Sequence, residues 1–310
     1  MVEILTSQVV SGLATGCVYA LIALGFVLIF KATDVVNFAQ GEFVMVSGFI
    51  SYTLLIWFGF PYWVVFFLTI ALSGCMGVGL ERLVVRPIMD APIFSIVIAT
   101  IGASTVMRSL AGIVYGYDVL PLPTIFSKDP IRLGVLNFTA MDTGVIGFSL
   151  VIMLALYLFF KLTKTGTAMR ATAQSQTAAR LMGVSVARIF SLTWAISAAV
   201  GGVAGVLIAP IIYLDPNLGF IGVKAFAGAI LGGFGSIPGA IVGGMLLGVL
   251  ENLSGYFFNA GIKQVSTYIL LILVLVVRPS GLFGAAPVRK VWPGWRPAGS
   301  SGSRSRSSSR

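Results

Sequence analysis

Two strongly apolar segments lie on either side of a polar, basic stretch near the middle of the chain. The first ends with FSLVIMLALYLFF (148–160), the second begins with IFSLTWAISAAVGGVAGVLIAP (189–210), and KLTKTGTAMRATAQSQTAARLMGVSVAR (161–188) joins them. A helix needs about 20 apolar residues to cross the hydrocarbon core of a bilayer. The two segments therefore predict membrane-spanning helices, and similar apolar runs recur along nearly the whole chain.

The stretch 161–188 contains no acidic residue. Its cations are Lys161, Lys164, Arg170, Arg180 and Arg188. Because Lys and Arg beside membrane spans stay on the cytoplasmic side, this loop is predicted to face the cytoplasm. It is long enough for one or two short helices, with Gly166 and Gly183 as breaks and Ser185 as a cap for the following helix. Since a simple connection would need only a few residues, we interpret the loop as a docking element for a cytosolic partner.

The composition is that of a membrane protein. Of the 310 residues, 57% are hydrophobic and only 10% are charged, whereas a soluble domain has about 25% charged residues. We expect an all-α, polytopic membrane helix bundle with about eight full transmembrane helices and one short or re-entrant segment. The predicted full spans are approximately 9–30, 44–58, 64–80, 93–113, 143–160, 189–209, 238–257 and 264–277, and the short segment is 219–233.

The distribution of charge predicts the orientation. Most of the net charge of +10 lies in 161–188 and in the C-terminal tail, which places both on the cytoplasmic side and argues against a nucleic-acid partner. Five predicted spans precede the cytoplasmic loop, which puts the N-terminus outside. An even number of crossings must lie between the loop and the tail, so the short segment 219–233 is expected to cross as well. Residues 285–310 change abruptly to Pro, Gly, Ser and Arg, so they are predicted to be a disordered basic tail after a transmembrane domain at 1–284.

Several kinds of chemistry are disfavoured by residue type. The chain has no histidine, and its two cysteines, Cys17 and Cys75, lie in apolar runs, so histidine-based catalysis, a metal site and a disulfide framework are not expected. No glycine precedes a lysine, so the phosphate loop GxxxxGKS or GxxxxGKT is absent. We expect no cofactor and no catalysed reaction in this chain. If ATP drives it, another subunit must hydrolyse the ATP.

Glycines recur at intervals of four residues in the C-terminal half. Small residues at this spacing let membrane helices approach closely. We interpret them as residues that pack helices together within one bundle. The alternative is that they form smooth helix faces, which let the helices slide past one another during transport. These glycines are Gly228, Gly232, Gly235, Gly239, Gly243, Gly244 and Gly248.

A short polar stretch separates the first two spans. In VVNFAQGEF (35–43), the polar side chains are those of Asn37, Gln40 and Glu42. An irregular polar stretch at membrane depth persists only when protein buries it or water lines it. The stretch is therefore either a plain cytoplasmic turn or part of a translocation path or gate.

Charged residues also occur within later spans. Arg108 follows Ser104 by about one turn in the fourth span, and it either faces the interior or extends to the nearby outer interface. Lys224 in the short segment and Glu251 in the next span raise the same question. We expect no charged pair at mid-span and no catalytic couple there, which disfavours a secondary carrier and an intramembrane enzyme.

Six segments, in order along the chain, resemble one family. They are 12–43, 81–88, 165–184, 191–207, 224–244 and 278–284, with GLATGCVYALIALGFVLIFKATDVVNFAQGEF and TGTAMRATAQSQTAARLMGV among them. On these segments the chain resembles the LivH-type permease subunits of bacterial high-affinity branched-chain amino acid ABC importers. The resemblance extends over nearly the whole chain before the tail.

This resemblance implies a subunit of the bacterial inner membrane that forms a translocation path with a second, related permease by alternating access. The implied partners are two cytosolic ATPases, which bind ATP and Mg, and a periplasmic amino acid-binding protein. Leucine, isoleucine and valine are the implied substrates. An importer of the same architecture that carries urea or short amides is one alternative, and a secondary carrier is another. The implied ATPase-coupling residues are Gly166, Met169, Arg170, Ala171, Ala178, Arg180, Leu181, Met182 and Gly183.

Overall fold

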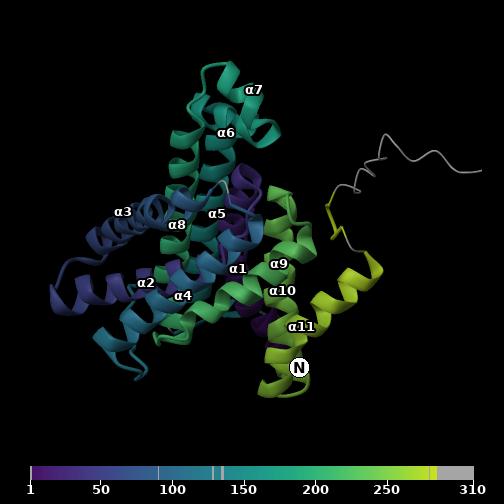
Figure 1. Cartoon of the computed structure of the whole chain (residues 1–310). Coiled ribbons are helices and arrows are strands. Elements are labelled where there is room, and N and C mark those ends of the chain that lie inside the picture. Colours follow the sequence, from purple (N-terminus) through teal and green to yellow (C-terminus); the bar gives the residue numbers. More distant parts are fainter. Residues whose placement is uncertain (1, 90, 128, 134–135, 279, 285–310) are drawn as a thin grey trace, which may run out of the picture.

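The protein is a bundle of helices in the computed structural model, which describes residues 2–89, 91–127, 129–133, 136–278 and 280–284 (Figure 1). The predicted tail at 285–310 lies outside the described residues. Among the described helices, six are long and apolar enough to cross a membrane. They are Glu3–Thr33, Tyr62–Ile88, Ile93–Tyr115, Ala140–Leu162, Val186–Ile212 and Ile237–Phe257. The predicted fold class, an all-α polytopic membrane bundle, is confirmed.

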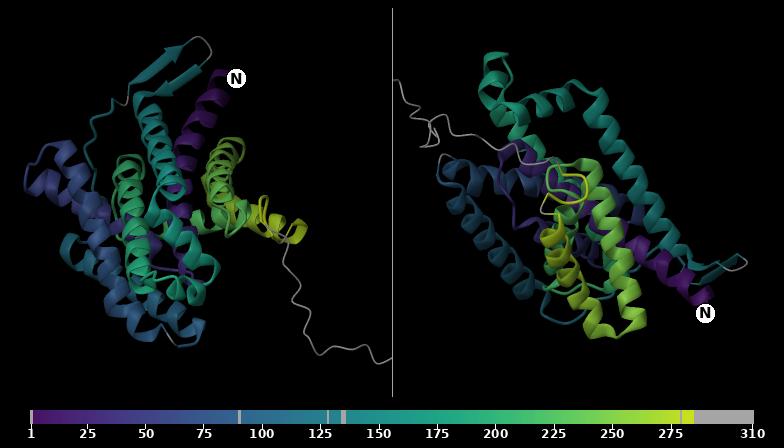
Figure 2. Two further views of the ribbon diagram at one scale, coloured as in Figure 1. Left: turned by 90° about the horizontal axis from the view of Figure 1, so that it is seen from above. Right: turned by 90° about the vertical axis from the view of Figure 1, so that its right-hand side faces the viewer.

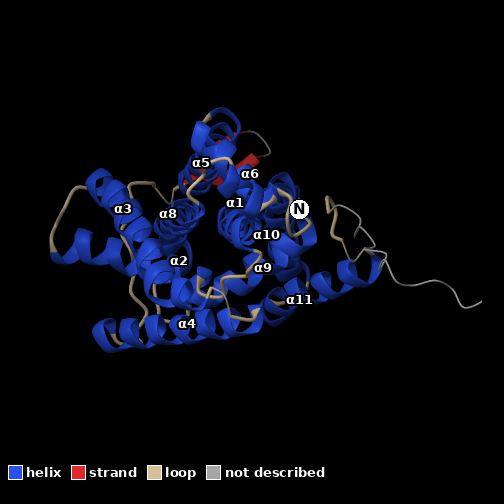
Figure 3. Cartoon of the chain, turned by 45° about the horizontal axis from the view of Figure 1, so that its top comes forward, coloured by secondary structure: helices blue, strands red, loops and turns tan. Residues whose placement is uncertain are grey.

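The described helices account for most of the chain, as Figure 3 shows. They are α1 (Val2–Thr33), α2 (Gln40–Tyr52), α3 (Tyr62–Leu80), α4 (Ile93–Tyr115), α5 (Ala140–Leu162), α6 (Lys164–Gln174), α7 (Gln176–Leu181), α8 (Val186–Ile212), α9 (Ile221–Gly232), α10 (Ile237–Phe257) and α11 (Ala260–Val277). The π-helix η1 (Thr53–Trp57) follows α2. The π-helix η2 (Glu81–Val85) and the 3-10 turn η3 (Arg86–Ile88) follow α3. The 3-10 turn η4 (Leu218–Phe220) precedes α9.

All nine predicted apolar segments form helices, but three of these helices are short. η4 and α9 together cover Leu218–Gly232, in agreement with the predicted short segment. α2 and the segment Gly261–Val277 of α11 are not among the six helices that are long enough to cross a membrane, although full spans were expected there. For α2 the reason is that its first residues, Gln40–Met45, are already buried inside the bundle. This helix starts at depth, so it does not need the length of a complete crossing.

The centre of the bundle is α1. Its side chains are buried almost without interruption from Ala14 to Ile29, and it packs against α8, α9 and α10. Glycines allow the closest approach: a Cβ added at Gly16 would lie 2.6 Å from the carbonyl oxygen of Met245. Water does not drive association within a bilayer, so such close packing is a main source of helix–helix affinity.

Six of the seven predicted packing glycines lie on α9 or α10 against a neighbouring helix. They are Gly228, Gly232, Gly239, Gly243, Gly244 and Gly248. A Cβ at Gly232, for example, would lie 1.8 Å from the carbonyl oxygen of Gly239. Gly235 differs, because it lies in the loop between α9 and α10 with a φ of +134°, and a Cβ there would contact nothing. Its assignment to helix packing is wrong; it is a turn residue in a conformation that favours glycine.

The two ends of the bundle differ. α6 and α7 project from one end, and the N-terminus of α1 lies toward the other (Figure 1). A hairpin of β1 (Pro130–Leu133) and β2 (Leu136–Thr139) lies beside this N-terminus (Figure 2). The hairpin was not predicted, because four-residue strands are too short to show an alternating pattern. α5 runs from the hairpin to α6 and begins with a capping box between Thr139 and Asp142.

Candidate functional site

The basic loop forms two short helices, as predicted. The Thr163 hydroxyl accepts a 2.9 Å hydrogen bond from the Gly166 amide and starts α6. The Ser175 hydroxyl accepts one of 3.2 Å from the Ala178 amide and starts α7. Gly183, with a φ of +82°, follows the end of α7. These local caps explain why α6 and α7 remain separate from the long helices α5 and α8.

One face of this α6–α7 element is anchored to the rest of the protein. Gly166, Met169 and Ala179 are buried, and a Cβ at Gly166 would lie 2.6 Å from the carbonyl oxygen of Phe159. The opposite face carries Leu181 and Met182, which are 83% and 85% exposed. The remaining predicted coupling residues of the two helices are also exposed: Arg170, Ala171, Ala178 and Arg180. The element therefore presents two large apolar side chains within a basic surface.

The polar stretch after α1 is buried and is not a surface turn. Asn37 and Gln40 are fully buried, and Glu42 is 2% exposed. The Gln40 amide group donates a 3.3 Å hydrogen bond to the carbonyl oxygen of Ser197, and the Ser197 hydroxyl lies 2.9 Å from Gln40 Oε1. Ser197 is near the middle of α8, and Gln40 also packs against Gly25 of α1. The chain thus turns back into the bundle before α2 begins.

Glu42 pairs with Arg108 inside the bundle. The Arg108 guanidinium donates to Glu42 Oε1, and the Ser104 hydroxyl donates to the same oxygen over 3.1 Å. The guanidinium also lies 4.0 Å above the ring of Phe220 in η4. Arg108 therefore faces the interior and does not extend to the interface. From the sequence we expected no charged pair at mid-span and did not foresee this pair, whose Arg108 lies within the candidate span Ile93–Tyr115.

A second charged pair links α9 to α10. Lys224 Nζ lies 2.6 Å from Glu251 Oε1, and the Tyr19 hydroxyl of α1 donates to Glu251 Oε2 over 2.8 Å. Glu251 is only 4% exposed. These residues line a cavity of about 700 Å³ near the hairpin end, which Asp142 and Lys263 also line. Because Phe220 precedes Lys224 by about one turn, the start of α9 contacts both charged pairs.

A third buried carboxylate was not predicted. Glu81 in η2 accepts two hydrogen bonds from Arg86, over 3.0 and 3.1 Å, and one of 2.9 Å from the Ser191 hydroxyl of α8. The motif ERLVVRPI contains both charges, five residues apart, but the contact with α8 depends on the fold. Within the described residues, no group of three or more Cys, Asp or Glu side chains is placed to hold a metal ion.

The fold is that of a multi-pass membrane protein. The family model described as "Branched-chain amino acid transport system / permease component" matches residues 8–277, and the chain belongs to this family. The resemblance seen in the sequence motifs is thereby confirmed.

Relatives support the same assignment along nearly the full length. The chain is 35% identical to the high-affinity branched-chain amino acid transport system permease protein LivH of Salmonella typhimurium, over 92% of this chain and 97% of that protein. It is 34% identical to BraD of Pseudomonas aeruginosa, with the same coverage, and 30% identical to a probable LivH of Methanocaldococcus jannaschii, over 85% and 88%. A solved structure, PsaBC from Streptococcus pneumoniae in complex with Fab, aligns with a TM-score of 0.49 and 13% identity. The alignment covers 89% of this chain and 92% of that one, and this similarity adds nothing to the assignment.

Proposed function

We propose that the chain is the membrane-spanning subunit of an ATP-driven importer for leucine, isoleucine and valine. Its membership in the permease family and the printed functions of its relatives support this proposal. In this account the chain catalyses no reaction and binds no cofactor. Two cytosolic ATPase subunits bind ATP and Mg, a second, related permease completes the path, and a periplasmic binding protein delivers the amino acid.

We infer the orientation from the placement of charge. The α6–α7 element and the chain after α11 face the cytoplasm of a bacterial cell, and the hairpin and the N-terminus of α1 face the periplasm. The cations of 161–188, with no acidic residue among them, support this orientation. The protein then resides in the inner membrane.

The exposed tip of α7 is the observation that carries the coupling mechanism. Leu181 and Met182 lie at the end of a short helix whose opposite side is fixed to the bundle. Apolar side chains on one helix face bind well in a groove of a partner protein. When the ATPases close on ATP, their movement would be transmitted through α6 and α7 to α5 and α8.

The buried polar groups suggest where the moving parts meet. Glu42 joins α2 to α4, and Glu251 joins α9, α10 and α1. The start of α9 lies between these two pairs, so a change in its position would alter both. We propose that Asn37, Gln40, Glu42, Ser104, Arg108 and Lys224 form a gate of the translocation path during alternating access.

The coupling assignment is tested by replacing residues 170–180 with a Gly/Ser linker in the complete transporter. Leucine uptake should be lost because the ATPases no longer have a rigid contact, while assembly in the membrane is checked by immunoblotting. Uptake that remains coupled to ATP would show that the docking assignment is wrong.

Two alternatives are decided by the substrate and by the energy source. Competition of labelled leucine uptake by isoleucine, valine, urea and acetamide identifies the substrate class; competition by urea or acetamide alone would indicate an amide importer. The buried Glu42–Arg108 pair is a feature that secondary carriers share. Uptake by the chain alone in proteoliposomes, without ATPases, would favour a secondary carrier.

A further inference from the structure

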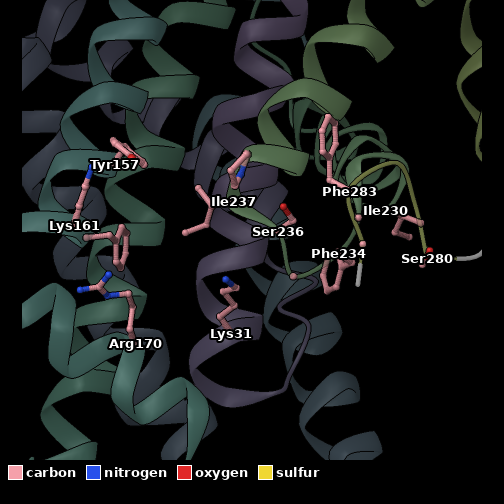
Figure 4. Close-up of a pocket in the computed structure, with 15 residues that line it drawn as sticks. Lys31, Tyr157, Lys161, Arg170, Ile230, Phe234, Ser236, Ile237, Ser280 and Phe283 are labelled. Atoms are coloured by element: carbon pink, nitrogen blue, oxygen red, sulfur yellow. The ribbon is translucent and has the colours of Figure 1, made fainter. Parts of the chain in front are cut away.

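A large cavity opens at the end of the bundle that carries the α6–α7 element. Its volume is about 960 Å³. It is bounded by the last turns of α5, by α6, by the end of α1, by the loop between α9 and α10, and by residues 280–284 (Figure 4). Segments that are far apart in the sequence therefore enclose one space.

The polar side of this cavity is strongly basic. Lys161 and Arg170 lie across from Phe234 and Phe283, with Lys31 between them (Figure 4). No Asp or Glu lines this cavity among the described residues, and these three cations take part in none of the ion pairs found there. An anion that enters this cavity would be attracted by each of these cations.

Neighbouring groups do not supply this anion. The Lys161 ammonium lies 5.5 Å from the ring centre of Tyr157, and Arg170 donates a 3.2 Å hydrogen bond to the Thr167 hydroxyl. Asp34 lines an adjacent cavity of about 380 Å³, together with Lys31 and Arg170, but it does not line the larger one. Among the described residues, the larger cavity is thus lined by three cations and by no carboxylate.

The other walls of the cavity are apolar. They are formed by Phe160, Ile230, Phe234, Ile237 and Phe283. A soluble phosphate ester would use only the basic side of such a cavity. A ligand with an anionic head and hydrocarbon chains would use both sides, and basic pockets between transmembrane helices at the cytoplasmic face bind lipid head groups of this kind.

We propose that this cavity binds one anionic phospholipid, with its phosphate among Lys31, Lys161 and Arg170 and its acyl chains against the aromatic and aliphatic wall. The proposal rests on the proposed function for two points, the cytoplasmic leaflet as the source of the lipid and the coupling to the ATPases, but not for the binding of the lipid itself. Because Arg170 belongs to α6, the bound lipid holds the α6–α7 element to the end of α1. Anionic lipid then supports the coupling of the ATPases to the bundle.

The test measures lipid retention by the purified, assembled transporter with native mass spectrometry. Phosphatidylglycerol and phosphatidylcholine are added separately to delipidated protein, and the variant Lys31→Gln/Lys161→Gln is compared with the unmodified chain. We expect phosphatidylglycerol to bind more tightly than phosphatidylcholine. The removal of each cation should weaken the affinity for phosphatidylglycerol by about fivefold, or by about 25-fold for the double variant. The control Lys164→Gln/Arg188→Gln removes two exposed cations of the same loop that do not line this cavity, and it should retain the lipid.

Further arms separate the sources of the phosphate and the other occupants. Glycerol 1-phosphate at millimolar concentration should displace little phosphatidylglycerol; equal binding of the two would mean a site for soluble phosphate esters and would overturn the lipid proposal. Equal retention of phosphatidylglycerol by the chain and by Lys31→Gln/Lys161→Gln would also overturn it. So would the absence of retention in the assembled transporter, as expected if a partner subunit fills the cavity. Leucine uptake, measured on the same preparations, tests the proposed function independently.

Discussion

The buried polar centre and the exposed α6–α7 element solve opposite problems. Gln40 and Glu42 lie deep in the bundle, and partners from α4 and α8 within the same chain satisfy most of their polar atoms. Leu181 and Met182 are more than four-fifths exposed and have little to pack against in this chain. The comparison teaches that the first region finds most of its polar partners within one subunit, whereas we expect a partner protein to cover the second. Substitutions in the first region should therefore reduce stability, and substitutions in the second should reduce coupling.

The largest loss of stability is expected for Arg108→Leu. The substitution leaves the Glu42 carboxylate buried without a charged partner, and such a change costs about 3–5 kcal/mol. Thermal unfolding of the purified protein in detergent should show a strong decrease in the midpoint, and transport should be lost.

The double variant Glu42→Gln/Arg108→Gln is the matched control for this pair. It removes both charges and leaves polar groups of similar size, so it should recover much of the stability lost in Arg108→Leu. If both variants unfold at the same temperature as the unmodified chain, the buried pair is not a structural element.

A smaller loss is expected for Lys224→Met. Glu251 would lose its cation but keep the hydrogen bond from the Tyr19 hydroxyl. A hydrogen bond to a charged group contributes about 1.5–3 kcal/mol, so a decrease of this size in the free energy of unfolding is expected. Adding Tyr19→Phe should increase the loss further. Independent, additive effects of the two substitutions would contradict a shared network.

Packing at the glycines predicts the next effect in size. A Cβ at Gly243 would lie 2.2 Å from the carbonyl oxygen of Gly228, so Gly243→Ala should push α9 and α10 apart and cost about 1–3 kcal/mol. Gly147 of α5 is the matched control, since a Cβ there contacts nothing within 4 Å. Gly147→Ala should leave stability unchanged or raise it slightly. Equal unfolding temperatures for the two variants would remove the close-packing argument.

The sequence was sufficient for the features that depend on local pattern. Apolar runs located the long helices, the glycine spacing indicated close packing within the bundle, and the basic loop between two spans indicated one or two short helices, which are α6 and α7. The charged pairs could not be derived in the same way. Glu42 and Arg108 are 66 residues apart, and they meet only because α2 begins inside the bundle. Gly235 was misassigned because spacing alone does not reveal where a helix ends.

The smallest change in stability is expected for Leu181→Ser/Met182→Ser. This variant is also the most direct test of the central claim, that the tip of α7 couples the chain to its ATPases. Because both side chains are exposed, the free energy of unfolding should change by less than about 0.5 kcal/mol, as it should for the exposed control Leu83→Ser. Apolar anchors of an interface each contribute more than about 1 kcal/mol to the free energy of binding. ATP-driven leucine uptake by the complete transporter should therefore fall by about tenfold or more in the double variant. Uptake should stay near normal in the control. Normal uptake in the double variant, at an equal amount of protein in the membrane, would contradict the role of the α7 tip in coupling.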